Sequence, residues 1–171
     1  MNRPSLVRLL MALGADLNKP DKALWSPCIV ASFCGFARVV AVLAEGGARG
    51  TLDVMCLSRS DMSAIDYCCE EGHAETARVL LALGAGAARA DKRMNTPTMK
   101  AAAAGHAHVI RVLAENAGSG PSAAEHNGKL NVNAVDASRK TALDYAKQHG
   151  HDDCAKALRL LGARTKPELA Q

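Results

Sequence analysis

The 171-residue sequence predicts an all-α solenoid, in which antiparallel helix pairs stack side by side and hairpin loops join one pair to the next. Two observations predict this fold. An eleven-residue block occurs four times without gaps, and an apolar segment of constant length follows each copy. Hydrophobic residues make up 49% of the chain but aromatic residues only 3%, so Ala, Val and Leu must fill the core, which suits closely packed thin helices.

The repeated block has Ser or Thr at its first position and Gly at its tenth. Its copies are SPCIVASFCGF from Ser26, SAIDYCCEEGH from Ser63, TPTMKAAAAGH from Thr96 and TALDYAKQHGH from Thr141. The segments that follow them read ARVVAVLAEGGA, AETARVLLALGA, AHVIRVLAENAG and DDCAKALRLLGA, and LVRLLMALGA before the first block is a partial fifth copy. Such a unit cannot bury its apolar face alone, so we expect the copies to stack.

Each block is expected to begin a helix at its Ser or Thr, whose side chain can accept a hydrogen bond from an unpaired backbone N–H. Pro27 and Pro97 then occupy the first helical position, where Pro is favoured. In the two blocks without Pro, Asp66 and Asp144 stand three residues after the opening Ser or Thr. That spacing predicts a capping box with Asp in place of Glu.

Glycine is expected to end each first helix, because the tight turn into the second helix needs a left-handed backbone conformation. These glycines are Gly35, Gly72, Gly105 and Gly150. The second helices carry apolar residues at helical spacing, such as Val39, Val40, Val42 and Leu43, or Val109, Ile110, Val112 and Leu113. Each helix pair is therefore amphipathic and can bury its apolar stripe only against its neighbours.

These blocks resemble ankyrin repeats, whose pattern is Thr-Pro-Leu-His, then Gly-His, then a Leu-rich helix that closes with Gly-Ala-Asp. The segment GADLNKPD from Gly14 to Asp21 is similar to that closing hairpin, and the resemblance covers nearly the whole chain. It implies one ankyrin-repeat solenoid domain over 1–171. Within it we expect a half-repeat at 1–20, repeats at about 21–57, 58–90, 91–135 and 136–166, and a short tail at 167–171.

The chain departs from the ankyrin pattern at two positions of the repeat. The usual His is replaced by Ile29, Asp66, Met99 and Asp144, so the side-chain network of that His is not expected. The usual hairpin Gly is replaced by Leu24, Asp61, Met94 and Arg139. Since these residues tolerate a left-handed backbone poorly, we expect the hairpins to be distorted or strained.

Successive blocks are 37, 33 and 45 residues apart, so two hairpins are enlarged, after Ala48 and after Gly118. The second insertion is rich in Gly, Ser, Asn and Ala, which predicts a long mobile loop. Two interpretations of the insertions stay open. They could mark the binding side of the solenoid, or they could be neutral lengthening of loops, which costs little free energy.

The two ends of the solenoid are expected to differ. At the first, Leu6, Val7, Leu9 and Leu10 lack the first helix of their repeat. Self-association could cover them, residues missing from a fragment could do so, or the half-repeat could cap the stack at some cost in exposed apolar area. At the other end, polar residues on the last helix predict a terminal cap, and the tail PELAQ is expected to fray.

The resemblance implies that a partner binds in a concave face, formed by the hairpin tips and the outward side of the first helices. The basic residues of the tips make a discontinuous row there, and the second repeat adds acid. The candidate partner-binding residues are Lys22, Trp25, Phe33, Cys34, Arg59, Met62, Glu70, Glu71, Lys92, Arg93, Asn95 and Lys140.

Trp25 and Phe33 are the expected anchor, meaning the side chains that contribute most of the binding energy. The sole Trp and one of two Phe fall in the same repeat, at positions that the resemblance leaves to solvent. Binding hot spots are enriched in aromatic residues and Arg, and Lys22 and Arg59 flank this pair. In the alternative interpretation, the Trp25 ring folds over its own hairpin and replaces the missing Gly turn.

Other kinds of site are not supported by the sequence. Nucleotide binding lacks a GxxxxGK[ST] motif, and residues two apart, such as His106 and His108, point to different sides of a helix and make poor metal ligands. No His lies at a spacing that would activate Cys34 as a nucleophile. We therefore expect no catalytic residue, no metal and no cofactor, and the chain is not expected to be an enzyme.

Partners and location follow from charge, hydropathy and cysteine spacing. The net charge is only +4 with both signs interspersed, so nucleic acid is not an expected partner. The apolar stretches stay well short of the roughly 20 residues that cross a bilayer, so membrane insertion is not expected. The six cysteines show no repeated CxxC pair and no secretory leader precedes them. They are expected to be reduced thiols in the cytoplasm or the nucleus.

The sequence thus predicts a non-catalytic protein–protein interaction module, a scaffold, adaptor or inhibitor, whose partner is another protein or a peptide. Two alternatives stay open. The chain could be a regulatory or targeting segment of a larger multidomain protein or enzyme. It could also bind nucleic acid or an anionic surface more weakly through its basic tips, in which case affinity should fall steeply with added salt.

Overall fold

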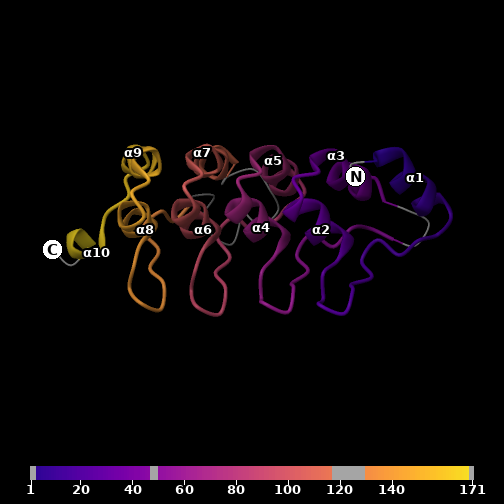
Figure 1. Cartoon of the computed structure of the whole chain (residues 1–171), viewed down its shortest axis with the longest axis horizontal. Helices are drawn as coiled ribbons and strands as arrows, with labels where there is room; N and C mark the ends of the chain where they lie inside the picture. The colour runs from indigo at the N-terminus through magenta and orange to yellow at the C-terminus, as the bar shows by residue number, and fades with distance from the viewer. Residues whose placement is uncertain (1–2, 47–49, 117–129, 170–171) are drawn as a thin grey trace.

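The computed structural model describes residues 3–46, 50–116 and 130–169, and in these ranges it contains helices and one isolated bridge between Leu57 and Ser63. The helices α1, α3, α5, α7 and α9 form one row and α2, α4, α6 and α8 a second row, from which the hairpins project (Figure 1). This confirms the all-α solenoid. The helices are α1 Pro4–Ala12, α2 Pro27–Phe33, α3 Ala37–Ala44, α4 Ala64–Glu71, α5 Ala74–Ala82, α6 Pro97–Ala104, α7 Ala107–Asn116, α8 Ala142–Gln148, α9 Asp152–Leu160 and α10 Lys166–Leu169.

The first helix of each repeat begins where the sequence predicts. The Ser26 hydroxyl accepts a hydrogen bond from the backbone N–H of Ile29 at 3.3 Å, ahead of Pro27 at the first position of α2. In α4, which lacks Pro, the Asp66 carboxylate accepts the backbone N–H of Ser63 at 2.9 Å. The equivalent bond from Thr141 to Asp144 opens α8, also at 2.9 Å. Both predicted capping boxes are therefore confirmed.

The closing glycines join neighbouring repeats as well as ending their own helices. Gly35, Gly72, Gly105 and Gly150 have φ between 71° and 86°, the left-handed conformation predicted for them. The imidazole of the following repeat packs against three of these glycines and bonds to a carbonyl just before them. These bonds run from His73 Nε2 to Phe33 O (3.0 Å), from His106 Nε2 to Glu70 O (3.0 Å) and from His151 Nε2 to Ala103 O (3.1 Å).

The core is one continuous apolar seam between the two rows of helices. The predicted stripe of the second helices is buried in α3 and again in α7, where Val109, Ile110 and Leu113 have no exposed surface. The first helices contribute Ile29, Ile65, Met99 and Leu143, each at most 2% exposed. Because the seam runs through all repeats, a partner can reach only the hairpins, the outward sides of the two rows of helices and the two ends.

All four hairpins keep one hydrogen-bonding pattern. In the third, Asp91 N–H bonds to Asn95 O at 3.0 Å and Met94 N–H bonds back to Asp91 O at 2.8 Å. The Asp91 carboxylate also accepts the backbone N–H groups of Arg93 and Asn95, both at 2.9 Å. The same bonds start from Asp21 and Asp136, and in the second hairpin Ser58 takes this position.

In each hairpin, the residue that replaces the usual Gly is strained, but the hydrogen bonds of the turn are kept. Each replacement adopts the left-handed conformation, which costs an L-residue about 1–2 kcal/mol. The φ values are 62° at Leu24, 63° at Asp61, 63° at Met94 and 59° at Arg139. The expected backbone strain is therefore confirmed, and the expected distortion of the hairpins was a wrong prediction.

Replacing strained residues with Gly should therefore stabilise the fold. We expect the triple variant Leu24→Gly/Met94→Gly/Arg139→Gly to raise the free energy of unfolding by about 2 kcal/mol, since relief of strain exceeds the flexibility that Gly adds to the unfolded chain. All three side chains are exposed. Asp61 is left unchanged because its carboxylate pairs with Arg89. Urea unfolding measures the change, and Ala23→Gly, beside Leu24 but without a positive φ, is the control expected to destabilise.

The ends and insertions agree only in part with the sequence predictions. Residues 117–129 hold most of the second insertion and lie outside the described residues. The prediction that this loop is mobile therefore concerns residues that the structure does not describe. The tail is not frayed up to Leu169, so that prediction was wrong. It forms α10, because the Glu168 carboxylate accepts hydrogen bonds from Arg159 at 2.6 and 2.8 Å and from the Thr165 backbone at 2.9 Å.

Candidate partner-binding surface

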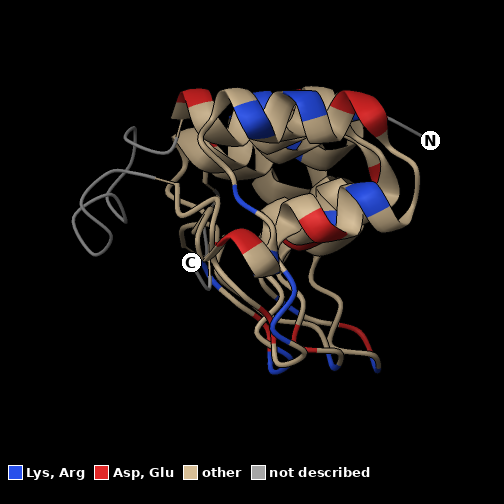
Figure 2. Ribbon diagram, turned by 90° about the vertical axis from the view of Figure 1, so that its left-hand side faces the viewer, with Lys and Arg blue, Asp and Glu red and all other residues tan. Residues whose placement is uncertain are grey.

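The hairpins and the first helices form the two walls of a concave face. In side view the hairpins project away from the stacked helices and carry Lys and Arg at their tips (Figure 2). Neighbouring tips are bonded to each other, since Arg59 donates from its backbone to Ala23 O at 3.3 Å and from its guanidinium to Lys22 O at 2.9 Å. The Ala137 N–H donates to Arg93 O in the same way, at 3.0 Å. The first hairpin is thus linked to the second, and the third to the fourth.

The fifth residue of three of the four blocks connects the two walls. In three repeats its side chain reaches the first residue of its own hairpin, joining Tyr67 to Ser58 (3.1 Å), Lys100 to Asp91 (2.8 Å) and Tyr145 to Asp136 (2.6 Å). Donation to the Asp136 carboxylate raises the pKa of Tyr145 to about 12, so its hydroxyl stays neutral. The first repeat has Val30 at this position, which cannot make the bond and is 43% exposed.

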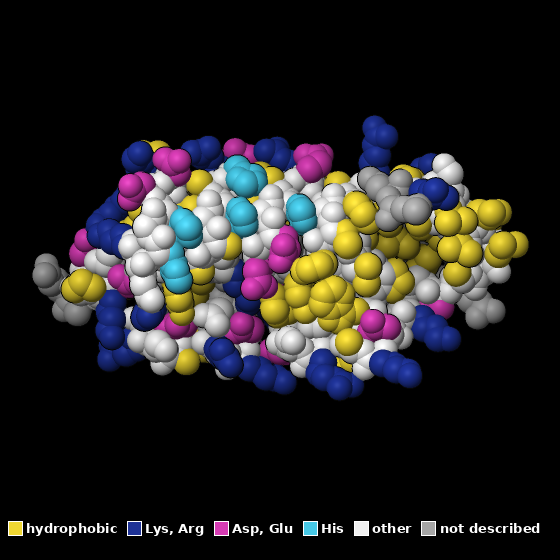
Figure 3. All heavy atoms as spheres, in the orientation of Figure 1, with side chains coloured by type: hydrophobic (Ala, Val, Ile, Leu, Met, Phe, Trp, Pro, Cys, Tyr) yellow, Lys and Arg dark blue, Asp and Glu magenta, His cyan; other side chains and the backbone are white. Residues whose placement is uncertain are grey.

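An aromatic patch lies where the first two repeats meet, and we define it as Trp25, Val30, Phe33 and Tyr67. The Trp25 ring lies 5.3 Å from Phe33 and 4.9 Å from Tyr67, and Phe33 lies 5.9 Å from Tyr67. Phe33 remains 38% exposed and Trp25 is half-buried, whereas Tyr67 is buried. On the concave face a hydrophobic patch borders acidic side chains (Figure 3). Trp25 therefore packs on the next repeat, and Leu24 itself makes the left-handed turn.

The predicted residues divide into those that meet and those that stay apart. Trp25 and Phe33 are in contact, with Arg59 and Lys22 at the adjoining tips. Glu70 and Asn95 line one cavity in the third repeat, away from that patch. Lys140 bonds to Gln148 at 2.7 Å, in the last repeat. The exposed members of the predicted set are Lys22, Phe33, Cys34, Arg59, Glu70, Glu71, Lys92 and Arg93, and the partly exposed ones are Trp25, Met62, Asn95 and Lys140.

A buried ion cluster lies behind this surface, between the second and third repeats. Lys100 Nζ lies 2.8 Å from Asp91 Oδ2 and 3.2 Å from Asp66 Oδ1, and the Asp66 side chain is fully buried. Arg89 adds contacts to Asp61 at 3.2 Å and to Asp66 at 3.8 Å. Burial would raise the pKa of Asp91, but the hydrogen bonds from Lys100 and from backbone N–H groups outweigh it and lower that pKa. Two carboxylates thus compensate the Lys100 charge.

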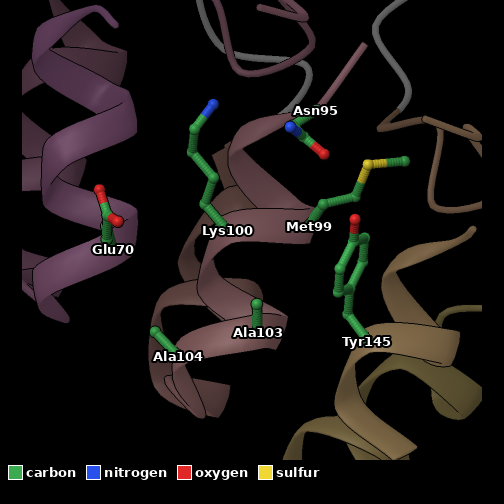
Figure 4. Close-up of a pocket in the computed structure, with 7 residues that line it drawn as sticks. All are labelled: Glu70, Asn95, Met99, Lys100, Ala103, Ala104 and Tyr145. Carbon is green, nitrogen blue, oxygen red and sulfur yellow. The ribbon is translucent and has the colours of Figure 1, made fainter. Parts of the chain in front are cut away.

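A hollow opens on the concave face over α6. Its volume is about 360 Å³ and it is lined by Glu70, Asn95, Met99, Lys100, Ala103, Ala104 and Tyr145. Glu70 stands on α4 at one side and Tyr145 on α8 at the other, with the short Ala103 and Ala104 side chains of α6 between them (Figure 4). The hollow exists because α6 has Ala at the two positions where α2 has Phe33 and Cys34.

Sequence reasoning missed Val30, Tyr67, Lys100 and Tyr145 as residues of this face. A signal for them was present, because all four are the fifth residue of their block. Their roles were not readable from that position, since Val, Tyr and Lys there could equally face solvent. The contact between each of them and its hairpin depends on how far the hairpin folds back, which the alignment of blocks does not give.

Other kinds of site find little support in the part of the chain that the structure describes. There, no group of three or more His, Cys, Asp or Glu could hold a metal ion. Burial raises the pKa of Cys28 and of Cys68 to about 12, so both thiols stay protonated. Within the same ranges, no helix has both the length and the apolar character that spanning a bilayer requires.

Helix α1 leaves an apolar face open, as the sequence predicts for a half-repeat. The exposed fractions are 48% for Leu6, 56% for Leu9 and 48% for Leu10, and Leu13 adds 76%. A groove of about 170 Å³ runs between this helix and the first full repeat. Hydrophobic side chains are visible at this end of the molecule in Figure 3.

Residues 86–167 match the family model described as "Ankyrin repeats (3 copies)". The Ankyrin repeat domain-containing protein SAT10 of Stachybotrys chartarum (strain CBS 109288 / IBT 7711) is 27% identical over 181 residues, covering 95% of this chain and 9% of that protein. Ankyrin repeat domain-containing protein 63 of Homo sapiens is 30% identical over 122 residues, covering 71% of this chain and 29% of that protein, and its Mus musculus counterpart is 28% identical over the same length.

The chain spans less than a third of the length of these relatives. The family model stops short of the first repeats, but those repeats have the same N-caps, closing glycines and hairpins as the repeats it matches. With its stacked helix pairs and projecting hairpins, the chain is an ankyrin-repeat protein.

Proposed function

We propose that this chain is a non-catalytic interaction module that binds another protein or a peptide in its concave face. Ankyrin repeats are generally protein-interaction modules, and typically they are not catalytic. The observation that carries the proposal is the aromatic patch, because Val30 and Phe33 stay 43% and 38% exposed although the seam beside them is closed. Exposed apolar surface grouped beside polar residues is typical of an interface.

The proposal includes the role of the chain in a larger assembly. Since it spans less than a third of its relatives, it can serve as the binding segment of a longer scaffold, adaptor, inhibitor or regulated enzyme. Its six free thiols favour the cytoplasm or the nucleus, which imaging of the tagged chain would check. Self-association through the leucines of α1 stays a prediction, which concentration-dependent sedimentation would support.

Removing the exposed part of the aromatic patch should weaken binding. For peptides selected on the immobilised chain from a phage-displayed random library, we expect Val30→Ser and Phe33→Ser each to raise Kd by about tenfold or more, since interface hot spots cost 1–2 kcal/mol or more when truncated. These two positions are chosen because both are exposed, whereas Trp25 is half-buried and packs more closely on Tyr67 than Phe33 does, so its removal would disturb the fold more. Isothermal titration calorimetry measures Kd, and circular dichroism checks the fold.

The matched control is Leu160→Ser, an apolar residue on α9 that is 90% exposed outside the concave face, and its Kd should be unchanged. Equal affinity in all three variants would overturn the proposal. Binding of duplex DNA that falls steeply with salt and ignores Phe33→Ser would instead indicate recognition by the basic hairpin tips.

A further inference from the structure

The hollow over α6 has an uncompensated negative charge on its rim. Glu70 is exposed and, among the described residues, takes part in no ion pair, and Glu71 beside it is likewise exposed. The one cation that lines the hollow, Lys100, is held by Asp91 and Asp66. Tyr145 adds no charge because its hydroxyl donates to Asp136. A cationic side chain is therefore the complementary occupant.

The shape of the hollow favours Arg over Lys. Its floor is made of Ala103 and Ala104, and one wall is the ring of Tyr145 beside the Met99 side chain, with Glu70 on the opposite wall (Figure 4). A guanidinium on its long stem can lie across this floor of small residues and pair with the Glu70 carboxylate through two N–H groups, whereas an ammonium is a compact point charge. Lys140, 5.5 Å from the Tyr145 ring centre, bonds to Gln148 and does not line the hollow.

The hollow and the aromatic patch lie on consecutive first helices. The patch joins α2 to α4, and the hollow lies over α6 with Glu70 of α4 on its rim (Figure 1). Packed helices are about 8–10 Å apart, so the two features are separated by roughly 10–15 Å. In an extended peptide that distance corresponds to about three to five residues, at about 3.3 Å each.

We propose that the partner presents an extended segment with two determinants. A large apolar side chain packs on Val30 and Phe33 of the aromatic patch, and an Arg about three to five residues away enters the hollow and pairs with Glu70. This inference rests on the proposed function, since both determinants use the concave face. It adds the chemistry of the partner, which neither the patch nor the hollow fixes separately.

The test uses synthetic copies of the selected peptides, and the single Trp reports binding because it lies within the patch. We expect the peptides to share an apolar residue and an Arg at the stated spacing. Glu70→Gln should weaken binding about tenfold, Arg→Ala in the peptide should do the same, and the two changes together should cost no more than either alone. Ala103→Leu, which fills the hollow without changing charge, should weaken the same peptides to a similar extent.

Glu75→Gln on α5 is the matched control, because Glu75 is also an exposed carboxylate but lies in the other row of helices, and its Kd should not change. Peptides that depend on Phe33 but lack a basic residue, or that bind Glu70→Gln unchanged, would overturn the inference and leave the proposed function standing. Peptides insensitive to both Phe33 and Glu70 would overturn both.

Discussion

Gly72→Ala should lower the free energy of unfolding by about 3 kcal/mol, although it adds a single methyl group. Gly72 has a φ of 82°, and that conformation costs an L-residue about 1–2 kcal/mol. The new Cβ would also stand 2.7 Å from His106 Nδ1, so the ring must move. Moving it breaks the bond from His106 Nε2 to Glu70 O, which contributes about 1 kcal/mol. Urea unfolding followed by Trp25 fluorescence and by circular dichroism measures the loss.

Gly150→Ala is the matched control, because Gly150 closes the last of the first helices with a φ of 71° but has nothing within 4 Å of its Cβ position. It should cost only the backbone strain, about 1–2 kcal/mol. The difference between the two variants isolates the contact between repeats. Equal losses would show that the His106 ring adapts freely and that the imidazoles do not hold neighbouring repeats together.

The fold was predictable from the sequence because its determinants are local and recur. Ser26 and Thr141 cap helices through bonds to residues three positions away, and Gly72 ends a helix through its own φ. Repetition made each of these signals visible several times. The tail was mispredicted because its determinant is neither local nor repeated. Its helix depends on Glu168 reaching Arg159 nine residues earlier, a contact that occurs in one place only.

The candidate site was less predictable, because it depends on contacts between repeats. Trp25 and Phe33 were found as the rare aromatic residues of one repeat, but Tyr67 of the next repeat completes their patch. The hollow over α6 forms because Ala103 and Ala104 have shorter side chains than Glu70 and Tyr145 on the helices at either side. The sequence of one block does not show how the side chains of neighbouring blocks differ in size at the surface they share.

In the buried ion cluster behind the concave face, Lys100→Met should have the largest effect on stability. We expect it to lower the free energy of unfolding by about 3 kcal/mol. Removing one partner of a buried ion pair leaves the other charge uncompensated, at a typical cost of about 3–5 kcal/mol. Here Asp66 is fully buried and would retain Arg89, at 3.8 Å, as its one cation beside the hydrogen bonds from Ser63. Met keeps the length and apolar stem of Lys, so the loss reports the charge. Urea unfolding measures it.

Two comparisons separate the ionic contribution from packing. Lys147→Met, at an exposed lysine of α8, should change the free energy of unfolding by no more than about 0.5 kcal/mol. Asp66→Asn in the Lys100→Met background should recover much of the loss, because it removes the stranded charge and its amide oxygen can still accept the Ser63 N–H. A Lys100→Met variant as stable as Lys147→Met would show that the buried ion cluster contributes nothing net.

The pH dependence of Lys100→Met should change in a defined direction. The pKa of Asp91 is lowered in the folded chain, so its carboxylate stabilises the fold above the unfolded-state pKa of about 3.9. That stabilisation is lost as the pH falls through the lower folded value. Without Lys100 the Asp91 pKa moves back up towards its unfolded value, so acid should destabilise the variant less than the wild type. A steeper loss of stability in acid would contradict the assignment of Lys100 as the cation of this cluster.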